Sequence, residues 1–264
     1  MLSEILTFIF FILIGLEIRE GLNKPKDAIL PALAALGGMI VPALIFIAMI
    51  PGSDAWAVSM PTDVALAIGA LSILGKRVNP AVRLFLLTLA VADDFFSLVV
   101  IGIFFRQDLQ LASAIYTLGA ASIGFLLPLR HRLIAILSPI ATFAIIPIYI
   151  FINLLTKLDF SLSTESIVVA VVVARVIGKV LGITLFTYLA TRFTSLKLPL
   201  ALDLKEIVGV GFLAGMGLTV SIVIAEITLQ TESELAQVRM GLFFAAILSG
   251  LLGLLWLKRF PASL

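Results

Sequence analysis

The chain has 264 residues, of which 61% are hydrophobic and only 13% charged, and this composition is typical of an integral membrane protein rather than a soluble one. Its formal net charge of +2 is too small to indicate a nucleic-acid partner. The sequence contains no cysteine and one histidine, which excludes disulfides, thiolate metal sites, cysteine nucleophiles and a His-rich metal centre. We therefore expect neither an enzyme nor a resident cofactor.

Apolar runs near the roughly 20 residues that a membrane helix requires follow one another along the chain. There are nine, at about residues 3–20, 28–50, 55–74, 80–105, 109–129, 133–155, 167–190, 207–229 and 238–257. No stretch between them exceeds about sixteen residues, so no extramembrane domain is expected. The sequence therefore predicts a single all-α polytopic membrane domain over residues 1–264, with its function inside the membrane.

Basic residues fall mostly on one side of this predicted map. Thirteen of the 18 Lys and Arg residues lie in alternate connections on one side, against three, Arg106, Lys157 and Arg239, on the other. The remaining two, Arg175 and Lys179, lie inside the seventh span. Because Lys and Arg concentrate in cytoplasmic loops, we predict an external N-terminus and a cytoplasmic C-terminus.

Ionisable side chains inside the spans point to function, because each costs at least about 2.5–3.5 kcal/mol at the bilayer centre. Asp63 lies in the third span, Asp93 and Asp94 in the fourth, and Arg175 and Lys179 share one helix face in the seventh. A structural ion pair is one interpretation. Adjacent carboxylates point about 100° apart, however, so one basic partner does not easily neutralise both. Together they can bind a hard monovalent cation or carry protons, and competition between the two is sufficient for exchange.

Two spans contain residues that interrupt a helix. The third includes Met60-Pro61-Thr62-Asp63, where proline lacks a backbone donor and disfavours helix just before it. The eighth carries Gly209, Gly211, Gly215 and Gly217, a pattern that indicates either unwinding or close helix packing.

These two spans are the middle members of two triplets, which we predict to be inverted three-helix repeats. Repeat A covers about residues 28–105 and repeat B about 167–257, with connecting helices over about 109–155. Interrupted helices at matching positions of inverted repeats, crossing near the middle of the membrane, indicate a substrate site in secondary transporters.

Several segments resemble the NhaA-type sodium/proton antiporters in their amino-acid sequence and in their spacing along the chain. They are residues 11–17, 37–43, 61–67, 74–78, 89–94, 177–179 and 215–222. The resemblance implies a secondary active transporter that exchanges Na⁺ or Li⁺ for H⁺ across the bacterial inner membrane by alternating access, moving more protons than cations. Inverted repeats are a known property of that family, so their match with the triplets is not independent support.

The resemblance also implies roles for individual residues. Asp94 would be the principal cation and proton carboxylate, binding Na⁺ or Li⁺ together with Asp93. Asp93 would pair with Lys179 and exchange that partner during transport. Asp63, with Thr62, would lie where the broken helices cross. Membrane lipid is the other expected partner.

The chain also departs from the family pattern. Family members typically have twelve spans, whereas the first span and its hairpin have no counterpart here, and about two spans are missing after residues 119–125, before Pro128. That hairpin is the family's main dimer contact, so a homodimer is left open. Arg175 has no family counterpart and is a candidate additional charge partner for a carboxylate.

Two rival interpretations remain. A truncated, non-transporting homologue that acts as a structural remnant or partner subunit would explain the missing spans, although retention of every buried charge argues against it. An intramembrane aspartyl protease also needs carboxylates in the bilayer. Those enzymes use one Asp on each of two helices, one of them in a Gly-x-Gly-Asp setting, and neither Ala92-Asp93-Asp94 nor Pro61-Thr62-Asp63 fits.

Overall fold

The computed structural model describes residues 8–9, 11–13, 15–16, 19, 25–75, 78–104, 119–120, 122–126, 140, 144–199 and 202–259. Within these residues every regular element is helical and no strand occurs. The elements are α2 (Pro25–Met49), η1 (Asp54–Ser59), α3 (Val64–Leu74), α4 (Pro80–Phe104), α7 (Ile146–Asn153), η4 (Leu155–Lys157), η5 (Phe160–Leu162), α8 (Ser166–Val173), η6 (Ala174–Gly178), α9 (Lys179–Phe193), α10 (Leu204–Ala214), α11 (Thr219–Thr228) and α12 (Glu232–Arg259). Most of the predicted spans 3–20 and 109–129, and part of 133–155, lie outside the described residues.

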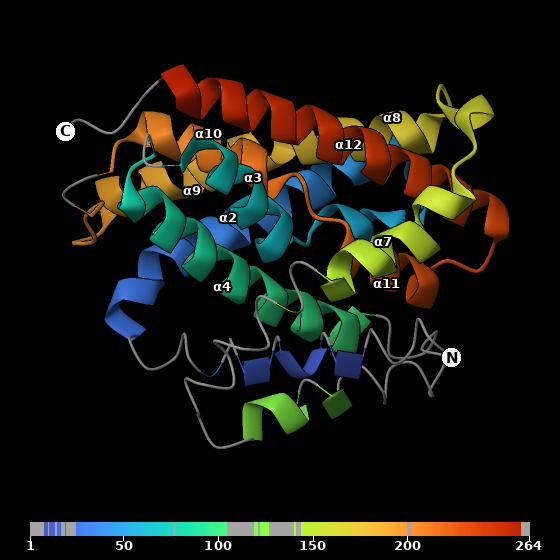
Figure 1. Ribbon diagram of the computed structural model, residues 1–264. Coiled ribbons are helices and arrows are strands. Elements are labelled where there is room, and N and C mark those ends of the chain that lie inside the picture. Colours follow the sequence, from blue (N-terminus) through green and yellow to red (C-terminus); the bar gives the residue numbers. More distant parts are fainter. Residues whose placement is uncertain are drawn as a thin grey trace.

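Helices of membrane-spanning length form the body of the described structure. Three of its helices are long and apolar enough to cross a bilayer, namely Ala28–Met49, Ser166–Phe193 and Glu232–Arg259, and the pair α10 and α11 makes a fourth if it counts as one bent span. Central α2 packs against α9 on one side and α4 on the other, while α12 packs along α8 and α10 (Figure 1). Outward-facing apolar side chains such as Leu44, Leu185 and Leu255 are 48–65% exposed, as expected for contact with lipid.

The predicted interruption at Pro61 is present. The short helix η1 ends at Ser59, residues 60–63 are not helical, and α3 begins at Val64. The physical reason is local, because proline cannot donate a backbone hydrogen bond and restrains the residue before it. Two half-helices therefore replace one continuous span.

The second interruption separates α10 from α11, whose axes are bent by 50° at the break. The glycines of this span serve both of the roles that the sequence left open. Gly215 and Gly217 lie in the non-helical residues 215–218. By contrast, Gly211 lies within α10, where a Cβ would come 2.8 Å from the Val180 Cα. Unwinding and close packing thus occur a few residues apart.

Glycines also bring α2 and α9 into backbone contact. A Cβ at Gly182 would lie 2.6 Å from the Gly37 carbonyl carbon, and a Cβ at Gly178 would lie 2.9 Å from the Pro42 Cα. Small residues permit this kind of approach between membrane helices, where packing replaces hydrophobic driving force. The contact fixes the start of α9, and Lys179 is its first residue.

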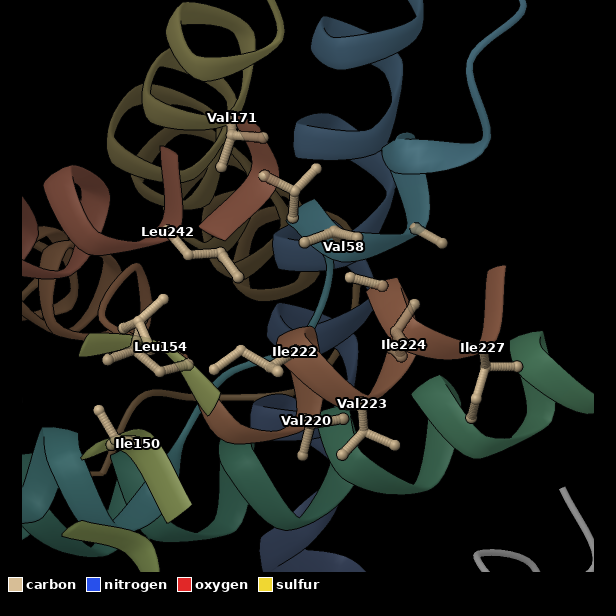
Figure 2. Packing of buried hydrophobic residues seen from close by; sticks show 14 of the residues in the cluster. Val58, Ile150, Leu154, Val171, Val220, Ile222, Val223, Ile224, Ile227 and Leu242 are labelled. Atoms are coloured by element: carbon tan, nitrogen blue, oxygen red, sulfur yellow. The ribbon is translucent and has the colours of Figure 1, made fainter. Parts of the chain in front are cut away.

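The short helix α11 lies in the interior of the protein. Nine of its ten residues are buried, with Glu226 the exception. Its apolar side chains belong to a cluster with Val58 of η1, Leu154 after α7 and Leu242 of α12 (Figure 2). A ten-residue helix enclosed in this way is suited to be half of an interrupted span rather than a separate one.

Candidate cation site where the two interrupted helices meet

The two helix breaks lie directly against each other, and Asp63 joins them. Its Oδ2 accepts hydrogen bonds from the Thr219 backbone N–H at 3.3 Å and from Thr219 Oγ1 at 2.7 Å. Its Oδ1 accepts from the Leu66 N–H at 3.4 Å. One carboxylate therefore caps the N-terminal turns of both α3 and α11, where helix dipoles favour negative charge. Gly217 permits the contact, since a Cβ there would lie 2.6 Å from the Pro61 carbonyl oxygen.

Lys179 reaches the first break from α9. Its Nζ donates hydrogen bonds to Asp93 Oδ2 at 3.2 Å, to Thr62 Oγ1 at 2.9 Å and to the Met60 carbonyl oxygen. The ammonium and the Asp93 carboxylate form an ion pair whose side chains are 1% and 0% exposed. The sequence-predicted residues Thr62, Asp93 and Lys179 are thus brought together in one contact.

The adjacent carboxylates occupy the middle of α4. Asp93 is fully buried and Asp94 is 4% exposed, and consecutive helical residues point about 100° apart. Asp93 uses Oδ2 for Lys179, while its Oδ1 has no hydrogen-bond partner within the described part of the chain. The charge of Asp94 also acts on Lys179. Asp93 Oδ1 is therefore available here to a hard cation or to a proton.

Arg175 lies one turn before Lys179, in the π-helical turn η6, a type of irregularity that is frequent at functional sites. Its guanidinium donates four hydrogen bonds, to Gly215 O (3.2 Å), Val58 O (2.6 Å), Ser221 Oγ (2.7 Å) and Pro61 O (2.8 Å). All four acceptors are neutral oxygens. Within the described residues Arg175 makes no hydrogen bond to a carboxylate, although the charges of Asp93 and Asp63 act on it. Its hydrogen bonds tie both breaks to the α8–α9 span.

The charged side chains at the crossing of the two breaks are arranged according to the polarity of the helix ends that they face. Asp63 faces the N-terminal ends of α3 and α11, whereas Arg175 and Lys179 face carbonyl groups at the ends of η1 and α10. Exposed carbonyls carry partial negative charge and exposed N–H groups partial positive charge. Each buried charge therefore offsets the opposite helix end.

Sequence reasoning assigned no contact to three further polar residues. Thr219 and Ser221 bind Asp63 and Arg175, and their position just after the Gly-Met-Gly turn was the available indication. Arg239, counted among the outer connections, lies inside α12, is 5% exposed and pairs with Glu226 at 3.5 Å. Helix α12 starts at Glu232 rather than near residue 238, so the pair links its first turns to α11.

Known proteins resemble this chain over most of its length. A family profile described as Na⁺/H⁺ antiporter 1 matches residues 1–132 and 128–257. The Na⁺/H⁺ antiporter NhaA 2 of Aliarcobacter butzleri is 30% identical, over 96% of this chain and 80% of the relative. The NhaA antiporter of Actinobacillus pleuropneumoniae serotype 3 is 32% identical over 95% and 80%, and that of Salmonella typhimurium is 30% identical over 97% and 82%.

The alignments agree with an internal gap in this chain. The comparison with the Aliarcobacter protein extends over 318 residues, although 96% of 264 residues is about 253, so about 65 aligned positions have no counterpart here. The two profile matches meet at residues 128–132, where the sequence predicts that about two spans are missing. The match nevertheless continues on both sides of that point, and the chain belongs to the Na⁺/H⁺ antiporter 1 family.

Proposed function

We propose that this protein exchanges Na⁺ or Li⁺ for H⁺ across the bacterial inner membrane by alternating access, with Asp93 and Asp94 as the carboxylates that bind both kinds of cargo. One observation carries the proposal. The buried ion pair between Asp93 and Lys179 lies beside the contact between two interrupted helices. Buried charges in a membrane are costly, and at broken helices they mark the substrate sites of secondary transporters. The antiporter relatives make Na⁺ and H⁺ the natural cargo.

The geometry suggests how the cation replaces the Lys179 ammonium at the Asp93 carboxylate. An entering Na⁺ competes with the ammonium for Asp93, because both are cations that bind the same carboxylate oxygens. Two of the three hydrogen bonds of Lys179, to Thr62 and to Met60, do not involve the carboxylate. The side chain can therefore release Asp93 without leaving the site. Protons on Asp94 and on Lys179 then leave when Na⁺ binds and return when it departs, so that more protons move than cations.

The inverted-repeat arrangement belongs to the same proposal. Repeat A, about residues 28–105, contributes Asp63 to the start of α11 in repeat B. Repeat B, about residues 167–257, contributes Arg175 and Lys179 to carbonyl groups of the break in repeat A. These reciprocal contacts are consistent with two inverted halves that share one site. With the connecting segment at about 109–155, the N-terminus lies outside and the C-terminus in the cytoplasm.

Transport in inside-out membrane vesicles tests the proposal. The vesicle lumen is acidified, NaCl, LiCl or KCl is added, and the loss of the pH gradient is followed for the wild type and for Asp94→Asn. Glu165→Gln, which alters an exposed carboxylate outside the site, is the matched control. We expect Na⁺ or Li⁺ to dissipate the gradient in the wild type and in the control but not in Asp94→Asn. No response from correctly folded wild-type protein between about pH 6.5 and 9 would instead favour a non-transporting homologue.

A further inference from the structure

Ser97 is a buried polar residue that the proposed transport cycle does not yet use. It lies on α4 four residues after Asp93, and residues at this spacing share one helix face. Its side chain is 2% exposed, and its Oγ has no hydrogen-bond partner among the described residues. A buried hydroxyl without a partner is unfavourable, and such a group in a folded protein indicates a ligand, an ion or a water.

Many other helical hydroxyls of this protein have a local partner, although Ser59, Thr184 and Ser249, like Ser97, have none among the described residues. Each of a set of seven donates a hydrogen bond to the carbonyl oxygen four residues earlier, the usual local partner. They are Ser72, Thr88, Thr156, Thr187, Thr191, Thr194 and Thr228. Ser97 has the carbonyl of Asp93 at the same spacing and does not bond to it. Both the proton and the lone pairs of this hydroxyl are therefore available to a ligand.

The face of α4 that carries Ser97 is turned toward the cation site. Phe96 and Val100, on that face, pack against a cluster that includes Met60, whose carbonyl oxygen accepts a hydrogen bond from Lys179. Four helical residues rise about 6 Å, so Ser97 lies about one turn after Asp93 on the same face of α4. Asp93 Oδ1 likewise has no hydrogen-bond partner in the described residues.

We propose that Ser97 Oγ is a further ligand of the transported cation, and that it favours Na⁺ over Li⁺. The proposal rests on the proposed function, in which Asp93 and Asp94 bind that cation. A hydroxyl is a hard, neutral oxygen ligand, so it adds to the coordination of a cation without adding charge that protons must later neutralise. Na⁺ is larger than Li⁺ and accommodates more oxygen ligands. A hydroxyl that completes the larger shell of Na⁺ is a ligand that the smaller Li⁺ does not need. Its loss therefore weakens Na⁺ binding more than Li⁺ binding.

Cation binding to the purified full-length protein tests this inference without requiring transport. Titration calorimetry with NaCl and with LiCl is carried out on the wild type, Ser97→Ala, Ser97→Thr and Asp94→Asn. Ser72→Ala, which removes an exposed hydroxyl bonded within α3, is the matched control. We expect Ser97→Ala to raise the Kd for Na⁺ about tenfold and that for Li⁺ about threefold, while Ser97→Thr and the control stay within about twofold of the wild type.

Stability without cations and transport kinetics supply two further readouts. Because Ser97 Oγ has no hydrogen bond to lose, Ser97→Ala should melt at or above the wild-type temperature when no cation is present. In vesicles it should raise the KM for Na⁺ and leave the maximal rate unchanged, whereas a purely structural role would lower both the melting temperature and the rate.

The outcomes separate the two proposals. Wild-type Na⁺ affinity in Ser97→Ala, together with loss of binding in Asp94→Asn, would overturn the role of Ser97 alone. Unchanged binding in Asp94→Asn would overturn the carboxylate site and with it the proposed function. Absence of Na⁺ and Li⁺ binding to the folded wild type would overturn both.

Discussion

Replacing Arg175 by methionine tests whether one guanidinium holds the two helix breaks together. The substitution keeps an unbranched side chain of similar length but removes four hydrogen bonds from a residue that is fully buried. Hydrogen bonds to a charged group contribute about 1.5–3 kcal/mol each, or about 6–12 kcal/mol in total. Removing the buried charge returns several kcal/mol of desolvation energy. We therefore expect a net loss of about 3–5 kcal/mol of stability.

Thermal unfolding of the purified protein in detergent measures this loss. At about 2–4 °C per kcal/mol for a chain of this size, Arg175→Met should melt about 6–20 °C below the wild type. Arg175→Lys keeps the charge but concentrates three donors on one nitrogen, so it cannot reproduce a fork that reaches four acceptors, and its melting temperature should fall between the two. Arg192→Met, on the exposed surface of the same span, should change little.

The result that would refute this reasoning is a melting temperature for Arg175→Met within about 2 °C of the wild type. The carbonyl groups of both breaks would then be held by the surrounding packing alone. A lysine variant as stable as the wild type would refute a narrower point, namely that the planar fork matters beyond its charge.

Three further predictions concern the packing and the other charges. Gly182→Ala should sharply reduce the yield of monodisperse protein, because its Cβ would lie 2.6 Å from the Gly37 carbonyl carbon, and a normal yield would contradict this. Gly102→Ala, whose Cβ would have no described atom within 4 Å, is the control. Asp63→Asn should cost about 1–2 kcal/mol in thermal unfolding, since one amide oxygen replaces two oxygens that cap two helices, and an unchanged melting temperature would argue against that role. Glu226→Gln should cost less than about 1 kcal/mol, because its partly exposed ion pair is weak; a larger loss would show that the pair anchors α11.

Two kinds of feature are predictable from the sequence: helix interruptions that depend on local backbone chemistry, and functional charges that stand out because charge is costly in a bilayer. Pro61 interrupts its span because the ring lacks a donor, and this can be read from one residue. Asp63, Asp93 and Lys179 stand out in the sequence because buried ionisable groups are costly, and the structure brings them to the same helix crossing. Helix starts were less predictable. Thr231, which caps the first turn of α12, precedes a polar stretch that a search for apolar runs leaves out.

Contacts made by Arg175 were beyond sequence reasoning. Three of its acceptors are backbone carbonyl oxygens, two of them 114 and 117 residues away, and every residue has a carbonyl group. The π-helical turn that carries Arg175 likewise has no distinctive sequence pattern. A charged partner was the natural expectation for a buried guanidinium, but exposed carbonyls at helix ends satisfy it equally well. Only the three-dimensional arrangement of the two breaks distinguishes these solutions.

Ion flux through the purified protein in liposomes tests the central claim most directly, because no other protein is present. Proteoliposomes without a membrane potential receive external Na⁺, and ²²Na⁺ uptake, internal pH and membrane potential are recorded together. We predict Na⁺ uptake coupled to proton efflux, with a potential that becomes negative inside because more protons leave than cations enter. Na⁺ uptake without proton movement, or no flux through folded protein, would contradict exchange at Asp93 and Asp94.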